Sequence, residues 1–207
     1  MIEGLRGHVI SILYFSWPTV AMGVIIAILL RVSYIFTNKK KFIIHEELFN
    51  LCFIIYILCL FYVVTFQDVS WASHNFIPFK EILRYNYTSK LFYKNVLGNV
   101  LLFVPFGYFI NNFLKNKKLL ISIVITMITS LSIELIQMNI GRSFDIDDII
   151  LNICGGCVGY LIYKVKEWVK NILPEFLKKN WIYNILWIIL LIVSTLFLLS
   201  YYGVIKL

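Results

Sequence analysis

The sequence predicts an all-α fold, a polytopic helical membrane protein with about six transmembrane helices, five being the alternative, and a cytoplasmic interfacial helix. The 207-residue chain is 60% hydrophobic, has a mean hydropathy of +0.84 and is only 14% charged. Soluble domains carry roughly a quarter charged residues. The apolar residues also gather into runs of about 20, the length that crosses a bilayer as a helix. Residues 1–207 are therefore expected to form a single membrane domain.

Six apolar runs supply the expected spans. The runs cover approximately residues 9–30, 48–66, 95–113, 119–139, 147–163 and 182–202. The first run is too long for the apolar region of a signal peptide and lacks a small-residue cleavage site, so no cleavable leader is expected. Pro18 and Pro105 lie inside spans, where proline is tolerated and usually kinks the helix.

The orientation follows from lysine and arginine. Most of the 19 Lys and Arg residues fall in the loops after the first, third and fifth runs. Positively charged loops stay in the cytoplasm, so both termini and the loops after the second and fourth runs are expected outside. Topology also explains the net charge of +8. No nucleic-acid partner is therefore expected.

Two connecting segments have apolar patterns of their own. In the segment 164–180, Val165, Trp168 and Ile172 recur at helical spacing between lysines. This pattern predicts an amphipathic helix on the cytoplasmic membrane surface, interrupted near Pro174; a solvated connector is the alternative. The loop 67–93 contains the apolar core NFIPF. Its aromatic residues are expected at the headgroup level, where aromatic side chains are enriched; they are Trp71, Phe76 and Phe79.

The positions of the cysteines indicate neither a zinc site nor a redox site, and no cofactor is expected. All four cysteines, Cys52, Cys59, Cys154 and Cys157, fall inside expected spans. The last two form a C-x-x-C motif, but no second pair and no histidine lies near them in sequence, as a zinc or redox site would need. We interpret them as small packing residues.

Polar residues recur at helical spacing on three of the spans. Each set lies on one helical face, and because the spans alternate in direction, all three sets fall at the same, outer end. The sets are Asn95 and Asn99; Ser130, Glu134 and Gln137; and Asp145, Asp148 and Asn152. Arg142 lies in the turn between the last two sets and is a natural partner for Glu134, since guanidinium groups bind carboxylates bidentately.

Glu134 is the most informative of these residues. It lies about 7–8 Å inside its span at 1.5 Å per residue, and an ionised carboxylate at the bilayer centre costs about 2.5–3.5 kcal/mol. It should therefore face protein or water instead of lipid. The candidate catalytic or ligand-binding cluster is Glu134, Arg142, Asp145 and Asp148, with Asn99, Gln137 and Asn152 orienting it.

Structural explanations also exist for several of these residues. Asp145 or Asp147 could cap the N-terminus of the fifth span by accepting from free backbone N–H groups. Asn95 and Asn99 could hydrogen-bond neighbouring helices to hold them together. Gly155 and Gly159 form a G-x-x-x-G motif, which allows close helix approach.

Four stretches together resemble the VanZ-like family. They are N-x-L-L-F-V-P-F-G from Asn99, S-I-E-L-I-Q from Ser132, G-R-S-F-D-I-D-D-I-I-L-N from Gly141 and G-G-x-x-G-Y from Gly155. The N-F-I-P-F loop from Asn75 fits the same family and adds Asn75 to the binding candidates. The resemblance covers residues 50–165, the expected VanZ-like core. It implies a bacterial cell-membrane protein linked to resistance against lipidated glycopeptides of the teicoplanin type.

Several functions are compatible with these observations. The first is a membrane protein whose outward-facing polar pocket binds, modifies or shields a membrane lipid, a lipid-linked cell-wall precursor or a lipoglycopeptide. The second is an intramembrane enzyme, in which Glu134 and an aspartate form an acid–base pair or Glu134, Asp145 and Asp148 hold a divalent cation. A transporter and a purely structural subunit are further alternatives, although no internal repeat and no polar path from face to face are visible.

Overall fold

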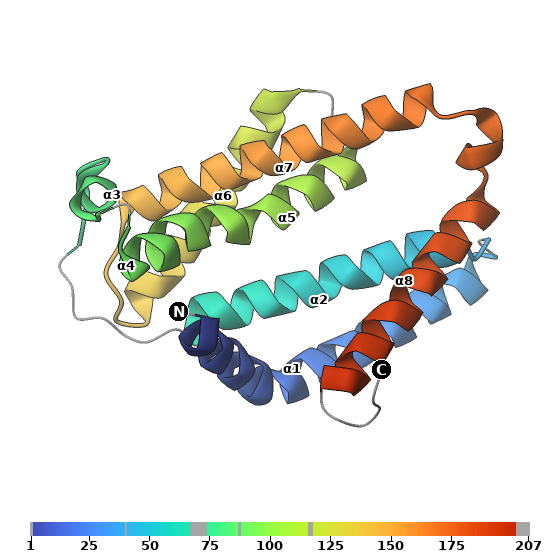
Figure 1. The fold of residues 1–207 in the computed structure, drawn as a ribbon, viewed down its shortest axis with the longest axis horizontal. Helices are drawn as coiled ribbons and strands as arrows, with labels where there is room; N and C mark the ends of the chain where they lie inside the picture. Colours follow the sequence, from blue (N-terminus) through green and yellow to red (C-terminus); the bar gives the residue numbers. More distant parts are fainter. Residues whose placement is uncertain (1, 40, 67–73, 87, 116–117, 202–207) are drawn as a thin grey trace.

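The computed structural model describes residues 2–39, 41–66, 74–86, 88–115 and 118–201, and within them the fold is helical (Figure 1). Trp71 lies outside the described residues. The long helices are α1 (Ile2–Thr37), α2 (Ile44–Phe66), α5 (Gly98–Leu114), α6 (Leu119–Asn139), α7 (Ile146–Ile172) and α8 (Asn180–Tyr201). The short ones are α3 (Lys80–Arg84), α4 (Lys90–Phe92), the π-helical turn η1 (Tyr93–Leu97) and the 3₁₀ turn η2 (Glu175–Lys178). The predicted all-α membrane fold is confirmed.

Five of these helices are long and apolar enough to cross a membrane. The stretches are Val20–Thr37, Ile44–Val64, Tyr93–Leu114, Leu119–Asn139 and Ile146–Ile172. The sixth expected run falls in α8, whose apolar stretch Asn180–Leu196 is shorter than the others among the described residues. The described chain therefore matches the lower of the two predicted counts.

The centre of the bundle is formed by α5, α6 and α7, with α2 packed beside them (Figure 1). The aromatic rings of Phe103 and Phe106 on α5 pack against Leu60 and Val64 of α2 in a buried apolar cluster. Large apolar side chains on the outward faces are exposed, as expected of helices that face lipid.

Glycines bring the backbone of α7 against that of α5. A Cβ atom on Gly155 would lie 2.2 Å from the carbonyl oxygen of Val100, and one on Gly159 would lie 2.2 Å from that of Val104. Gly107 on α5 is equally close to the backbone of Gly156. The predicted close approach at the G-x-x-x-G motif is therefore present, and only residues without a Cβ fit there.

The predicted interfacial helix after the fifth span is continuous with α7. This helix has 27 residues, about 40 Å at 1.5 Å per residue, whereas the hydrocarbon core is about 30 Å thick. Its last turns therefore extend past the membrane core, with Val165, Trp168 and Ile172 exposed. No helix-breaking residue separates them from the span, so the prediction of a separate helix is corrected. The predicted interruption is present, because α7 ends at Ile172, just before Pro174.

We expect Gly159→Ala to destabilise the protein, because the new methyl group would collide with backbone atoms of α5 that have no room to move. Overpacking of this kind costs about 1–3 kcal/mol. Gly98→Ala is the matched control, since a Cβ there meets nothing closer than 3.7 Å. Thermal unfolding in detergent measures both; equal midpoints for the two variants would contradict the proposed tight contact.

Candidate functional site

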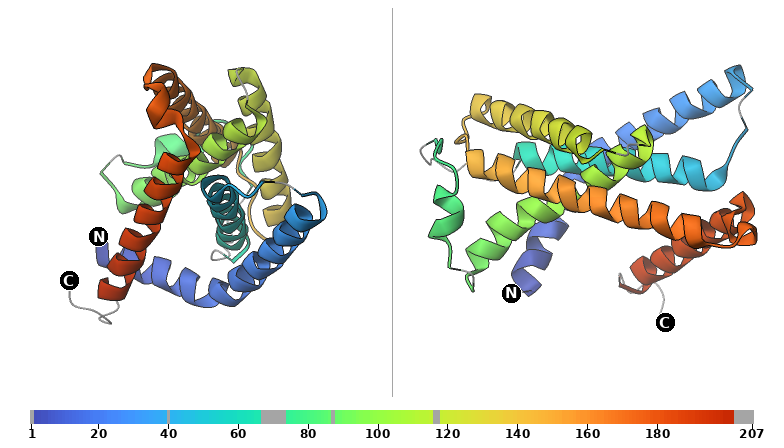
Figure 2. Two further views of the ribbon diagram at one scale, coloured as in Figure 1. Left: turned by 90° about the vertical axis from the view of Figure 1, so that its right-hand side faces the viewer. Right: turned by 90° about the horizontal axis from the view of Figure 1, so that it is seen from above.

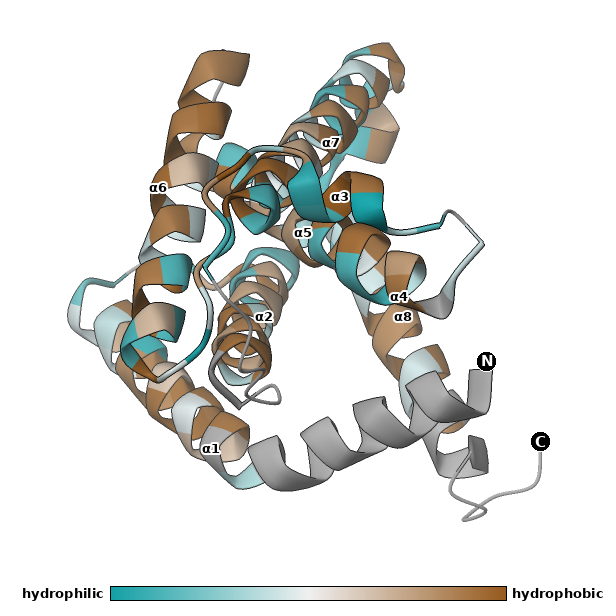
Figure 3. Ribbon diagram, turned by 90° about the vertical axis from the view of Figure 1, so that its left-hand side faces the viewer, coloured by the Kyte–Doolittle hydropathy of each residue, from teal (hydrophilic) through white to brown (hydrophobic). Residues whose placement is uncertain are grey.

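The predicted polar residues meet at the end of the bundle where α2 ends and α7 begins. Figure 3 looks onto this end and shows hydrophilic residues gathered around α3 and the starts of α5 and α7, between predominantly hydrophobic helices. Two segments build the site: the α6–α7 turn and residues 74–85, which cross the helix ends.

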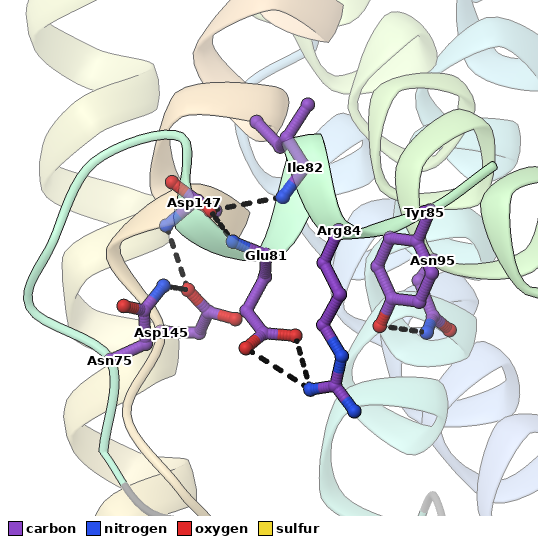
Figure 4. A network of polar contacts seen from close by, with 8 residues as sticks. All are labelled: Asn75, Glu81, Ile82, Arg84, Tyr85, Asn95, Asp145 and Asp147. Carbon is purple, nitrogen blue, oxygen red and sulfur yellow. Dashed lines mark hydrogen bonds and ion pairs between the residues drawn. The ribbon is translucent and has the colours of Figure 1, made fainter. Parts of the chain in front are cut away.

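Asn75 joins these two segments. Its backbone N–H donates to the carbonyl of Phe144 at 2.8 Å, and its carbonyl accepts from the N–H of Ile146 at 3.0 Å. Its side-chain Nδ2 donates to Oδ1 of Asp145 at 2.8 Å (Figure 4). Asn75 thus pairs with the α6–α7 turn as a short parallel strand would, and it is buried.

Asp145 is the N-cap of α7, as one of the structural explanations predicted. Its carboxylate accepts from the backbone N–H of Asp147 at 2.9 Å, which satisfies one of the free donors of the first turn. Burial raises the pKa of the Asp145 carboxyl, and the hydrogen bond from Asn75 opposes this effect. The backbone N–H of Asp145 in turn donates to Oε2 of Glu134 at 2.9 Å.

Asp147 anchors the segment 79–82, a role that the candidate set did not include. Its side chain is only 1% exposed. The carboxylate accepts from the backbone N–H group of Phe79. It also accepts from those of Glu81 at 2.7 Å and Ile82 at 3.2 Å (Figure 4). Phe79 has a φ of 66°, so its N–H turns toward the same point as those of α3. The sequence held a signal for this role, because three aspartates, Asp145, Asp147 and Asp148, lie within four positions. Only one of them can cap α7, so the other two must accept hydrogen bonds from elsewhere.

The register between α6 and α7 places Glu134 opposite Asp148. Asn152 Nδ2 donates to Ser130 Oγ at 2.8 Å, and one turn further along α7 Gly156 lies against Thr126. The two helices run antiparallel, so each step of four residues along α7 moves four residues back along α6. Asp148, one turn before Asn152 on α7, is therefore opposite Glu134 on α6. Glu134 is 2% exposed.

A hydrogen bond from α5 completes this arrangement. Asn99 Nδ2 donates to Oδ1 of Asp148, which links α5 to α7 about two turns before Gly155 on α7. Glu134 and Asp148 therefore lie between α5, α6 and α7 and form the inner part of the site. We call these two residues the carboxylate pair.

Arg142 and Gln137 do not join the carboxylate pair through the contacts seen. Arg142 Nη1 and Gln137 Nε2 both donate to the backbone carbonyl of Val64, at 3.0 and 3.2 Å. Within the described residues no ion pair joins Arg142 to Glu134. The expected direct hydrogen bonding to Glu134 is therefore absent from the described contacts, although Arg142 lies close enough for its charge to act on both Glu134 and Asp148. The last carbonyls of α2 lack helical N–H partners, and Arg142 and Gln137 supply donors to them.

Two further residues join the site from the loop. His74 Nδ1 accepts from the backbone N–H of Phe144 at 2.9 Å, so the loop brings this histidine to the α6–α7 turn. Asn95 donates to the hydroxyl of Tyr85 at 2.8 Å, which ties η1 to the end of α3 (Figure 4). Asn95 therefore serves packing, as the structural explanation predicted.

The geometry does not form a metal centre. Among the described residues, no group of three or more His, Cys, Asp or Glu side chains is placed to hold a metal ion. Both carboxylate oxygens of Asp147 accept from backbone N–H groups, and Oδ1 of Asp145 accepts from a backbone and an amide donor. What the site offers chemically is a hydrogen-bonded carboxylate network, with the carboxylate pair at its inner end.

We expect Asp147→Ala to release the loop, because three backbone N–H groups lose their acceptor. Hydrogen bonds to a charged group contribute about 1.5–3 kcal/mol each, so the free energy of unfolding should fall and the amides of residues 79, 81 and 82 should exchange faster with deuterium. Glu81→Gln is the control, since it keeps the backbone N–H that Asp147 binds and removes the side-chain ion pair with the exposed Arg84. Unchanged exchange in Asp147→Ala would show that the loop is held by other contacts.

Asp145 gives a pH dependence whose sign follows from its burial. Its pKa is raised in the folded protein, so the stabilisation linked to its proton is complete below the unfolded pKa and is lost as the pH rises through the folded pKa. We expect the wild type to lose stability relative to Asp145→Asn as the pH rises from about 4, the ordinary range of this group. Thermal midpoints of both proteins across pH test this; a constant difference would refute it.

The family comparison covers the part of the chain that builds this site. The family model VanZ/LLP1 matches residues 53–169, more than half of the chain, from within α2 to the last turn of α7. No protein of curated function and no solved structure matches the chain. The matched range contains every residue of the polar network described above. The chain therefore belongs to the VanZ/LLP1 family.

Proposed function

We propose that this protein protects the cell envelope against lipidated glycopeptides of the teicoplanin type, by binding, modifying or shielding the drug or the lipid-linked cell-wall precursor at the outer leaflet. Family membership supports the general role. The observation that carries the proposal is the carboxylate pair, Glu134 and Asp148, inside the bundle of membrane helices.

The carboxylate pair is difficult to explain by folding alone. Carboxylates within membrane spans are costly, and those that persist generally mark binding or reaction sites. Side chains other than the pair do most of the structural work at this end of the bundle, although Asp148 also links α7 to α5 and Glu134 accepts from the backbone of Asp145. Asp145 and Asp147 hold the helix start and the loop, while Arg142 and Gln137 bind the end of α2. The contacts described for Glu134 and Asp148 use one oxygen of each.

The chemistry of the pair suits a donor-rich ligand. Carboxylate oxygens accept hydrogen bonds from amides, hydroxyls and ammonium groups. Lipoglycopeptides and lipid-linked precursors combine such groups with an acyl chain. The pair lies between membrane helices near one end of them, which is where such a molecule would place its polar part while the chain stays in lipid. The lysines after α1 and α5 and at the end of α7 lie at the opposite end of the bundle, which supports an outer position for the pair.

The second candidate is an intramembrane enzyme that acts on a lipid-linked envelope substrate. The observation that favours it is the direct opposition of Glu134 and Asp148, since two carboxyl groups in one buried site share protons and can divide acid and base roles. Mass spectrometry of teicoplanin and of lipid-linked precursors from cells with and without the protein separates the candidates. Altered covalent structure supports the enzyme, and unaltered molecules support binding or shielding.

We expect Glu134→Gln to abolish protection. Cells of a teicoplanin-susceptible bacterium that express the wild-type protein should require more drug for inhibition than cells with an empty vector, and the variant should return them to the vector level. The glutamine keeps the size and one acceptor oxygen, so folding should be retained, which protein abundance in the membrane verifies.

Glu46→Gln is the matched control for this experiment. Glu46 is an exposed glutamate in the first turn of α2, at the opposite end from the carboxylate pair. This control should protect as well as the wild type. Equal drug sensitivity with wild-type protein and empty vector would end the proposal, and full protection by Glu134→Gln would remove the carboxylate pair from it.

A further inference from the structure

The segment 76–84 presents an apolar surface at the end of the bundle. Four large side chains on it are more exposed than is usual for residues of their kind. They are Phe76 (65%), Ile77 (62%), Phe79 (53%) and Leu83 (74%). Leu83 lies on α3 and its backbone N–H donates to the carbonyl of Phe79, the residue just before the helix, at 3.0 Å. We call these four residues the loop surface.

The exposure is imposed by a fixed backbone. The N–H groups of Phe79, Glu81 and Ile82 are bound by the buried carboxylate of Asp147. The N–H of Ile77 donates to Oδ1 of Asn75, which is itself paired with the α6–α7 turn. With the inner side of the segment held by these contacts, the apolar side chains are directed outward.

The segment lies where the membrane ends. The apolar span of α5 begins at Tyr93, shortly after α3, and the span of α7 begins at Ile146, directly beneath the segment. Figure 2 (right) shows α3 running across the ends of the spanning helices instead of along them. An element in this position lies along the membrane surface.

We propose that the loop surface inserts into the headgroup region of the surrounding phospholipid leaflet and binds anionic lipid. Charge complements the apolar side chains: Lys80 and Arg84 flank them and are exposed, while Glu81 is held against Arg84 at 3.1 Å. An apolar face flanked by basic side chains is the pattern of interfacial membrane helices. Contact of four large apolar side chains with water is unfavourable. A segment that crosses the ends of membrane-spanning helices lies at the bilayer boundary, where these side chains can contact lipid.

This inference does not rest on the proposed function. It has a consequence for the carboxylate pair, because Asp147 holds the segment and the backbone of Asp145 is bound to Glu134. The depth of the loop surface in the leaflet therefore sets the depth of Glu134 below the headgroups.

Site-directed spin labelling of the full chain tests the proposal. The four native cysteines are replaced by alanine, single cysteines are placed at Phe76, Phe79 or Leu83, and the protein is reconstituted in vesicles of equal parts phosphatidylcholine and phosphatidylglycerol. Accessibility to oxygen, which concentrates in lipid, is compared with accessibility to a water-soluble nickel complex. Ile128, an exposed residue in the middle of α6, is the lipid-facing control, and Thr88, in the polar turn before α4, is the aqueous control.

We expect the three labels to favour oxygen over nickel, at a depth about 5–10 Å into the headgroup and acyl boundary. Adding Lys80→Gln should make them shallower in these vesicles and leave them unchanged in pure phosphatidylcholine. Labels as accessible to nickel as Thr88 would overturn the proposal. Dipolar broadening between labels would also overturn it, because a second copy of the chain would then cover the surface. An equal effect of Lys80→Gln in both lipids would overturn the anionic-lipid part.

Discussion

The close contact between α5 and α7 is the constraint on which the rest of the structure depends. Because Gly155 and Gly159 have no Cβ, the carbonyls of Val100 and Val104 lie directly against the α7 backbone. This contact fixes the height of α5 against α7 and brings Asn99 to Asp148. The adjoining face of α7 meets α6 through Gly156 and Asn152, which sets Glu134 across from Asp148. Small residues on one helix thus decide which polar groups meet inside the membrane.

The polar residues at this end divide by task. Backbone groups freed at three helix ends need partners, because the membrane interior supplies none. Asp145 satisfies the start of α7, Asp147 satisfies the start of α3, and Arg142 with Gln137 satisfies the end of α2. These contacts explain most of the charge in the α6–α7 turn without any ligand. The carboxylate pair is not explained by these helix-end contacts, and we therefore propose it as the functional part of the network.

The sequence predicted the helical membrane fold, the polar faces and their meeting at one end, because helical period and hydropathy are local properties. It also offered Asp145 as one of two possible N-caps of α7, and Asp145 is the one that caps the helix. The partner of Arg142 was missed because the acceptor is a backbone carbonyl at Val64, and every residue has one. Asp147 was missed because its donors come from a loop 65–68 residues away in sequence. The separate interfacial helix was wrong because amphipathic spacing does not show where one helix ends and another begins.

The outer helices α1 and α8 are attached away from the site. Arg31 on α1 binds Glu47 at 2.7 Å, and Asn184 on α8 accepts from the backbone N–H of His45 at 3.0 Å. Both contacts are to the first turn of α2, whereas the polar network is reached through its last turn at Val64. The family match likewise begins within α2 and ends within α7. Among the described residues the contacts that build the network come from α2 to α7 and their connecting segments, and α2 contacts both the outer helices and the site.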